Sequence, residues 1–312
     1  MLKFDANVSL LWREVPFVER FQKAKDAGFD TVEFLWPYGE DLGAIADAIR
    51  RLGLGVALHN MDGGKMASGE RGYANDPARV SEWRGMFAKA LALAERVQCT
   101  RLNCLPGNTL PHLSHEAQLD QIVENFRWAL PQAERQGVTL LIEPLNTFDS
   151  PAYPYGHTAD GLALIQRIDS PAVRLQYDVY HMTRMEGNVP QTIRAHAGAQ
   201  QDSSLLHPVD AGRFGGRADD VRPSAGDIAH IQIADDPGRH EPGSGRIDWR
   251  EVFSAIEDSG YNGFVGLEYN PLGSTEDSLG WLPAGQDGAD GTSRVWRTRC
   301  TTSELNLKPQ EQ

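Results

Sequence analysis

The sequence predicts an α/β protein with one (β/α)8 barrel, an irregular insertion before the seventh strand and a C-terminal tail. Short runs rich in branched apolar residues alternate with segments of helical periodicity from the N terminus onward. Eight such runs occur, and closure into a parallel barrel is the economical arrangement for eight strands that alternate with helices. The length of 312 residues suits one large domain of this kind.

The eight expected strands lie at residues 4–9, 31–36, 55–60, 100–105, 138–143, 173–178, 228–233 and 263–268. The seventh reads IAHIQI and shows how such a strand is placed. Because side chains alternate between the faces of a strand, Ala229, Ile231 and Ile233 share one face, and His230 and Gln232 share the other. We expect the isoleucines to face the helices and the polar pair to face the barrel axis.

The expected helices lie at residues 17–28, 41–53, 80–97, 116–137, 158–169 and 248–260. Gly28 is a typical stop signal for the first helix, and Thr158 is the expected N-cap of the fifth.

The connection between the sixth and seventh strands is longer than any other. Most of the excess lies in residues 197–227, which have poor periodicity and many Gly, Asp, Ser and Pro residues. We expect an irregular insertion there, within a catalytic barrel at residues 1–283, and a disordered tail at 284–312. The insertion precedes a strand, so it enters the N-terminal face of the barrel, where it is expected to be tolerated.

The composition narrows the class of protein. A net charge of −13, from 43 acidic and 30 basic residues, argues against a nucleic-acid partner. The three cysteines include no C-x-x-C pair, so neither a disulfide framework nor a thiolate zinc site is indicated. No secretory signal and no apolar run of about 20 residues are evident, which predicts a cytoplasmic protein without a membrane partner. A homo-oligomer remains open.

Four consecutive strands, the fifth to the eighth, end in oxygen-bearing side chains. These residues are Glu143, Asp178, Gln232 and Glu268. A single polar residue at a strand end is more often in contact with solvent, but four together at the C-terminal face of a barrel indicate an active site. Three converging carboxylates repel one another unless a cation neutralises them. Oxygen ligands favour Mg²⁺ or Mn²⁺ over zinc.

Several segments resemble the hydroxypyruvate isomerase family, within the xylose isomerase-like barrels. The main ones are LIEPLNTFD, LQYDVYHMTRMEGN, HIQIADDPGRHEPGSG and GLEYNP, and the resemblance covers roughly residues 1–196 and 228–282. It implies that Glu143 and Glu268 serve as proton donor and acceptor, and that Glu143, Asp178, Gln232 and Glu268 hold a divalent metal. Arg246 departs from the resemblance, because members of the family often carry Glu there.

The expected reaction interconverts hydroxypyruvate and 2-hydroxy-3-oxopropanoate (tartronate semialdehyde), a small hydroxy-oxo acid pair that differs by one proton and the position of a carbonyl. One glutamate removes a carbon-bound proton and the other returns a proton to the adjacent carbon. A divalent cation would stabilise the negative charge of the enediolate. The sequence leaves a direct hydride shift open as the competing mechanism.

Five further residues are candidates for substrate binding. These are His59, Arg71, His181, Arg239 and His240. His59 ends the third strand, and His181 follows Asp178 closely enough to contact the substrate or orient that ligand. Arg71 lies in a glycine-dotted loop at 60–77 that would form a mobile lid, where it would bind a substrate carboxylate; an ordinary surface loop with a Glu70–Arg71 pair is the alternative.

Three other functions remain open. A 2-oxo-tetronate isomerase would use the same site on a four-carbon acid. A keto-sugar 3-epimerase is disfavoured because such relatives usually carry a histidine where this chain has Gln232. A binding protein whose catalysis is impaired by the insertion is the non-enzyme alternative.

Overall fold

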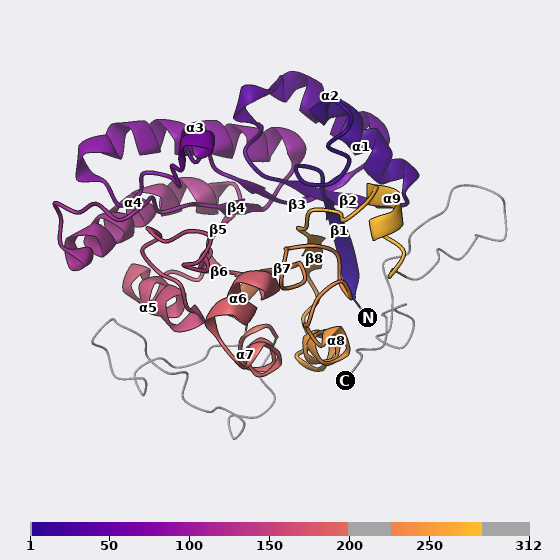
Figure 1. The fold of residues 1–312 in the computed structure, drawn as a ribbon. Helices are drawn as coiled ribbons and strands as arrows, with labels where there is room; N and C mark the ends of the chain where they lie inside the picture. The colour runs from indigo at the N-terminus through magenta and orange to yellow at the C-terminus, as the bar shows by residue number, and fades with distance from the viewer. Residues whose placement is uncertain (1, 199–225, 283–312) are drawn as a thin grey trace.

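Eight parallel strands in the computed structural model pair in sequence order and close into a barrel, as predicted (Figure 1). The structure describes residues 2–198 and 226–282. The strands are β1 (Lys3–Asn7), β2 (Thr31–Phe34), β3 (Gly55–Asn60), β4 (Arg101–Asn103), β5 (Thr139–Ile142), β6 (Val173–Asp178), β7 (Ile228–Ile233) and β8 (Phe264–Leu267). The first and last strands pair in parallel along four residues, which leaves no open edge.

Helices surround this barrel. They are α1 (Phe17–Asp26), α2 (Leu42–Leu52), α3 (Val80–Val97), α4 (His115–Arg135), α5 (Thr158–Ile168), α6 (Val179–Met185), α7 (Val189–His196), α8 (Trp249–Asp258) and α9 (Thr275–Ser278). Three short 3-10 turns, η1 (Pro37–Gly39), η2 (Met66–Ser68) and η3 (Pro77–Arg79), lie in the loops after β2 and β3. The six expected helices are confirmed within a few residues of their expected ends. The sequence analysis missed α6, α7 and α9, which are too short to show a clear period.

The predicted cap of α5 is wrong by one residue. His157 is the N-cap, and its backbone N–H donates to the Asp160 carboxylate at 3.1 Å. Thr158 is instead the first helical residue, and both its N–H (2.6 Å) and its hydroxyl (3.1 Å) donate to the carboxylate of Glu186. A partly buried carboxylate from the α6–α7 connection therefore satisfies the N-terminus of α5.

The predicted alternation in β7 is correct except at one position. Ile231 and Ile233 pack in the apolar layer between strands and helices, as expected. Ala229 does not join them; it packs with Leu58 and Leu141 in a small apolar cluster inside the barrel. The pairing of β6 with β7 shifts register at this point, so that Ala229 and His230 both face inward.

The two ends of the predicted insertion meet on the N-terminal face of the barrel. The backbone N–H of Gly226 donates to the carbonyl of Gly198 at 3.1 Å, so the chain leaves and re-enters the barrel at one place. This face is opposite to the strand ends that carry the candidate site. Most of the predicted insertion and all of the predicted tail lie outside the described residues.

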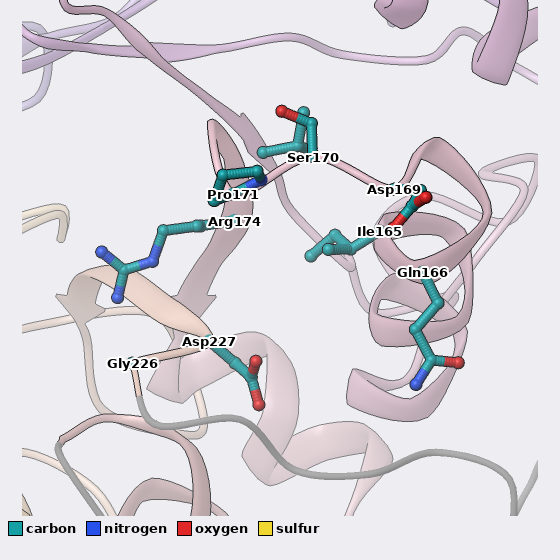
Figure 2. A pocket seen from close by; sticks show the side chains of 9 residues that line it. Ile165, Gln166, Asp169, Ser170, Pro171, Arg174, Gly226 and Asp227 are labelled. Carbon is teal, nitrogen blue, oxygen red and sulfur yellow. The ribbon is translucent and has the colours of Figure 1, made fainter.

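A polar pocket of about 470 Å³ lies beside this junction, between the turn after α5 and the starts of β6 and β7 (Figure 2). Arg174 is one of its lining residues, and its guanidinium donates to the carbonyl of Ile228 at 2.9 Å. Because it lies at the N-terminal ends of the strands, this pocket is separate from the strand-end carboxylates. Among the helices within the described ranges, none has the length and apolar character to cross a bilayer.

Candidate active site

The four strand-end residues meet at the C-terminal mouth of the barrel. Glu143 follows β5, Asp178 ends β6, Gln232 lies in β7 and Glu268 follows β8. All four are buried, and Asp178 and Gln232 are direct register partners on neighbouring strands. Because parallel strands bring their carboxyl ends to one face, these four side chains lie together at the C-terminal face of the barrel.

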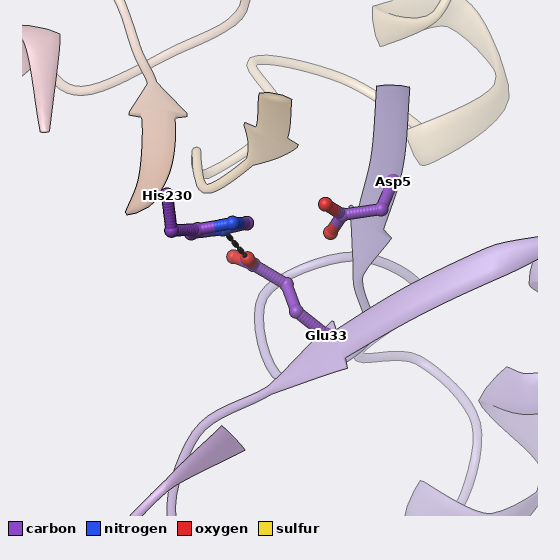
Figure 3. A group of neighbouring side chains, drawn as sticks. All are labelled: Asp5, Glu33 and His230. Atoms are coloured by element: carbon purple, nitrogen blue, oxygen red, sulfur yellow. Dashed lines mark hydrogen bonds and ion pairs between the residues drawn. The ribbon is translucent and has the colours of Figure 1, made fainter. Parts of the chain in front are cut away.

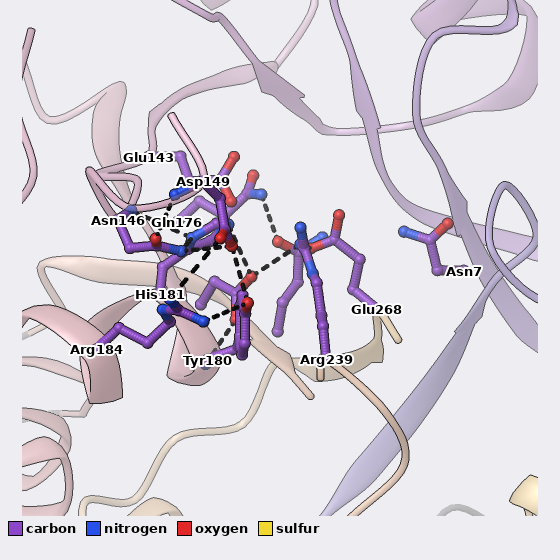
Figure 4. Close-up of polar contacts among 12 residues, drawn as sticks. Asn7, Glu143, Asn146, Asp149, Gln176, Tyr180, His181, Arg184, Arg239 and Glu268 are labelled. Atoms are coloured by element: carbon purple, nitrogen blue, oxygen red, sulfur yellow. Dashed lines mark hydrogen bonds and ion pairs between the residues drawn. The ribbon is translucent and has the colours of Figure 1, made fainter. Parts of the chain in front are cut away.

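Arg239 lies between two of these carboxylates (Figure 4). Its Nη2 is 3.2 Å from Oδ2 of Asp178 and 3.0 Å from Oε2 of Glu268. The guanidinium also packs over the ring of Tyr180, with its carbon 5.3 Å from the ring centre. Arg239 thus supplies one positive charge to a mouth that holds three carboxylates.

The loop that carries Arg239 is built around the buried carboxylate of Asp235. This carboxylate accepts hydrogen bonds from the backbone N–H groups of Asp236, Gly243 and Ile247 and from the indole N–H of Trp249. Arg239 itself has a φ of +58°, and its backbone N–H donates to the Asp235 carbonyl. The fold therefore holds this side chain over the mouth with a loop that these hydrogen bonds brace.

Burial governs the electrostatics of the carboxylates. It raises the pKa of Glu143 to about 8, with the charge of Asp178 adding to the effect. It raises the pKa of Asp178 to about 6, although Arg239 opposes the shift. The pKa of Glu268 is likewise raised well above its usual value by burial, again against the effect of Arg239. One arginine is not enough to neutralise three buried carboxylates, so the mouth favours a further positive charge or protons.

The residues at the mouth fit a divalent cation. Ligand atoms of Glu143, Asp178 and His181 all lie within 4.8 Å of one another, and all three residues are buried. Carboxylate oxygens predominate, and Gln232 adds an amide oxygen, a set that suits Mg²⁺ or Mn²⁺.

His181 is oriented as a donor toward Asp178. The backbone N–H of Asn146 donates to its Nδ1 at 3.2 Å, which leaves the ring proton on Nε2, 3.4 Å from Oδ2 of Asp178. Burial, with the charges of Arg239 and Arg184, holds its pKa well below the usual value, so the ring is neutral. His181 therefore supports the Asp178 carboxylate through its N–H.

Three inward-facing residues that the sequence analysis did not single out complete the site. Asn103 donates to Glu143 Oε2 at 2.6 Å, Gln176 donates to Gln232 Oε1 at 2.6 Å, and Glu33 accepts from Gln232 Nε2 at 2.8 Å. A glutamate inside the otherwise apolar strand TVEF was a signal that could have pointed to Glu33.

The structure does not bring His59 to the strand-end carboxylates. It faces the helix layer, where its ring stacks on that of Phe34 with 5.7 Å between centres, and burial lowers its pKa to about 4. Asn60, the next residue, is the register partner of Asn103. His240 binds the carbonyl of Asn270 through Nδ1 at 2.7 Å and so ties the loop after β7 to the loop after β8.

Arg71 lies in the loop after β3, which is held by its own contacts. Glu70 does not pair with Arg71; its carboxylate accepts from the Tyr73 hydroxyl at 2.5 Å and from the Lys65 N–H at 2.6 Å. Arg71 donates to the backbone carbonyl of Glu70 at 2.8 Å. Its charge also acts on buried Tyr153, whose pKa is raised mainly by burial and lowered slightly by Arg71. The Tyr153 hydroxyl donates to the backbone carbonyl of Glu143 at 3.1 Å.

Comparison with known proteins identifies the family of this chain. A family model described as xylose isomerase-like TIM barrel matches residues 21–284. The hydroxypyruvate isomerase of Escherichia coli (strain K12) is 37% identical over 282 residues, which cover 90% of this chain and 98% of that protein. The chain belongs to the hydroxypyruvate isomerase family. The resemblance seen in the sequence is thereby confirmed, and the chain is an enzyme of the isomerase type.

The chain is also similar to a second curated enzyme and to two solved structures. The 2-oxo-tetronate isomerase of Pectobacterium atrosepticum is 34% identical over 281 residues, which cover 90% of this chain and 97% of that protein. A crystal structure from Brucella melitensis, titled AP endonuclease, family 2, is 37% identical with a TM-score of 0.78 and covers 90% of this chain and 98% of that one. A 3-keto-D-glucoside 4-epimerase from E. coli, at 22% identity, a TM-score of 0.65 and coverage of 90% of this chain and 99% of that one, shares the fold.

The bridging role of Arg239 generates a stability prediction. Replacing it with Met leaves Asp178 and Glu268 without their shared counter-charge, and we expect the free energy of unfolding to fall by about 3–5 kcal/mol at pH 8. The loss should be smaller at pH 5, because the pKa of Asp178 is raised to about 6 and that of Glu268 is raised in the same direction, so protonation on acidification removes charge that Arg239 neutralises. Urea denaturation at the two pH values measures both effects.

Arg194→Met is the matched control. Arg194 also bridges two carboxylates, Glu251 at 2.8 Å and Asp258 at 3.3 Å, but all three side chains are substantially exposed. Its loss should cost about 0–1 kcal/mol with little pH dependence. Equal effects of the two substitutions would contradict a special electrostatic role for Arg239.

Proposed function

We propose that this enzyme interconverts hydroxypyruvate and 2-hydroxy-3-oxopropanoate by proton transfer between Glu143, Glu268 and the substrate, with a divalent metal ion, Mg²⁺ or Mn²⁺. The observation that carries the proposal is the pair of buried glutamates after β5 and β8, with β6 and β7 between them. Both have raised pKa values, so each can be present near neutral pH as an acid or as a base.

The reaction needs two proton movements on neighbouring carbons. In the forward direction one glutamate, as the carboxylate, takes a proton from C3 of hydroxypyruvate, and a carbon–carbon double bond forms between C2 and C3. The other glutamate, as the acid, gives a proton to C2, the hydroxyl proton on the C3 oxygen passes to the C2 oxygen, and C3 becomes the aldehyde carbon. The two glutamates return to their starting protonation states by proton exchange with solvent. The sum is the product with no net gain of atoms or electrons. A divalent ion held by Glu143, Asp178, Gln232 and Glu268 would supply positive charge opposite the oxygens that become negative.

The cationic side chains around the mouth suit a small acid. Arg239 lies within the carboxylate group, and Arg71 lies in the loop after β3. We propose that Arg71 binds the substrate carboxylate, with Arg239, His181 and His240 as further candidates for substrate contact. His59, which faces away from the mouth, has no such role in this proposal. A 2-oxo-tetronate is the second candidate substrate, because relatives named 2-oxo-tetronate isomerase match the same 90% of the chain at 33% and 34% identity.

The proposal also covers the location of the enzyme, its partners and its oligomeric state. We propose a cytoplasmic enzyme that binds neither nucleic acid nor membranes and that is able to form a homo-oligomer. The acidic composition and the polar, carboxylate-lined mouth support a small-molecule substrate over a nucleic acid.

Activity assays test the proposed reaction. We expect the intact chain, stripped of metal and then supplied with Mg²⁺ or Mn²⁺, to isomerise hydroxypyruvate with a higher kcat/KM than 2-oxo-tetronate. Glu143→Gln should lower kcat by about 10²–10⁴-fold, because the amide cannot take up or release the proton. Glu186→Gln is the matched control, since Glu186 is a partly buried glutamate whose carboxylate accepts from Thr158 at the start of α5.

Two results would contradict this assignment. An undiminished rate in Glu143→Gln would remove the proposed catalytic role. No turnover of either acid by the intact chain, with turnover restored by deleting residues 197–227, would identify a binding protein impaired by its insertion.

Isotope incorporation separates the two mechanisms that the sequence left open. In D₂O, proton transfer through glutamates that exchange with solvent should place deuterium on carbon in the product, measured by mass spectrometry or proton NMR after partial turnover. Complete retention of the substrate hydrogen would instead show a hydride shift and would remove the proton-transfer role of both glutamates.

A further inference from the structure

A second group of buried polar side chains lies inside the barrel, outside the set of proposed metal ligands and catalytic residues. Asp5 of β1, Glu33 of β2 and His230 of β7 are fully buried, and ligand atoms of all three lie within 4.8 Å of one another (Figure 3). The centre of this group is the Glu33 carboxylate. Its Oε1 accepts from Asn7 and from Gln232, each at 2.8 Å, and its Oε2 is 2.6 Å from His230 Nε2.

Glu33 reaches β7 because one intervening strand has no side chain in its way. The barrel order places β1 and β8 between β2 and β7, and the inward position of β8 at this level is Gly266. A Cβ atom at position 266 would lie only 2.4 Å from Oε2 of Glu33. The glycine therefore leaves the space through which a carboxylate from β2 contacts Gln232 on β7.

This contact dictates which way the Gln232 amide points. A carboxylate only accepts hydrogen bonds, so the NH₂ end of Gln232 must face Glu33. The carbonyl oxygen, Oε1, then faces away from Glu33 and accepts from Gln176 at 2.6 Å. Gln176 in turn forms a hydrogen bond that lowers the pKa of Glu143. The Glu33 carboxylate thus fixes the orientation of the Gln232 amide, whose carbonyl oxygen in turn accepts from the NH₂ group of Gln176.

Only one of the two orientations of Gln232 suits a cation. With Oε1 toward the mouth the amide offers a lone pair, whereas the flipped amide would present N–H groups that a cation repels. The two orientations have almost the same shape, so packing alone does not choose between them.

We propose that Glu33 is a positioning residue for the metal site: through the gap at Gly266 it holds the Gln232 amide with its carbonyl oxygen toward the strand-end carboxylates. This inference rests on the proposed function, because it assigns Gln232 as a ligand of a divalent ion. It adds a residue that touches neither the substrate nor the ion, and it explains why the inward position of β8 at this level is a glycine.

The affinity of the substrate-free protein for Mn²⁺ tests the proposal without reference to activity. Free Mn²⁺ is counted by its EPR signal during titration of the metal-stripped wild type, Glu33→Gln, Gly266→Ala and the double variant. Glu33→Gln gives Gln232 a partner that donates as well as accepts, so we expect Kd to rise about 10–100-fold. Gly266→Ala keeps the charge of Glu33 but displaces its carboxylate, so it should weaken binding in the same direction and serves as the test if Glu33→Gln does not fold.

The double variant shows whether both changes act through one contact. If they do, its Kd should be close to that of the weaker-binding single variant, because the Glu33–Gln232 contact is lost only once. Glu186→Gln, the same chemical change at another glutamate of low exposure, should leave Kd unchanged, and circular dichroism confirms that each variant is folded.

The outcomes separate this inference from the proposed function. If the wild type binds Mn²⁺ and the Kd of Glu33→Gln lies within twofold of the wild-type Kd, the positioning role is overturned and the proposed reaction stands. The positioning role is also overturned if the fold-increases in Kd of the two single variants multiply in the double variant, because the two substitutions then act independently. Wild type that binds no Mn²⁺ would overturn the metal site itself and the positioning role with it.

Discussion

Buried negative charge on the barrel axis is the constraint on which the rest of this structure depends. Glu143, Asp178 and Glu268 lie at the mouth, and Asp5 and Glu33 lie inside the same barrel, all of them withdrawn from water. A carboxylate taken out of water is costly unless it is paired, hydrogen-bonded or protonated. Each of these buried carboxyl groups meets one of these conditions.

At the mouth the compensation is partly ionic, through Arg239, and partly through amide donors such as Asn103. Inside the barrel Glu33 accepts from Asn7 and Gln232 and contacts His230. Burial and the nearby charge of Glu33 raise the pKa of Asp5 well above its usual value, which favours its neutral form. The stability that offsets these buried acids comes from the apolar layer between barrel and helices, to which Ile231 and Ile233 belong.

Most of the fold was predictable from the sequence, because a barrel with this strand order repeats one simple pattern. Strong apolar runs marked all eight strands, and long amphipathic segments marked six helices. The short helices α6 and α7 were not predictable from period, because seven or eight residues span only two turns. The inward position of Ala229 also escaped prediction, since a register shift between two strands breaks the alternation without any mark in the local sequence.

A site residue was predictable only where its position along a strand determines that its side chain lies at the C-terminal face of the barrel. Glu143, Asp178, Gln232 and Glu268 could be grouped because strand ends of a parallel barrel meet at one face. His59 could not be assigned to a face, because the point at which a strand ends differs by a residue or two and the side chains alternate. Glu33 required knowledge of a contact that crosses two strands, which depends on the missing side chain of Gly266. Such contacts follow from three-dimensional packing and carry no local signal.

The position of a bound metal ion tests the central claim most directly, since two groups of buried carboxylates compete for it. Crystals of the protein grown with Mn²⁺ and measured for anomalous scattering should show one peak at the mouth, bounded by Glu143, Asp178, Gln232 and Glu268. A peak among Asp5, Glu33 and His230, with none at the mouth, would contradict the account.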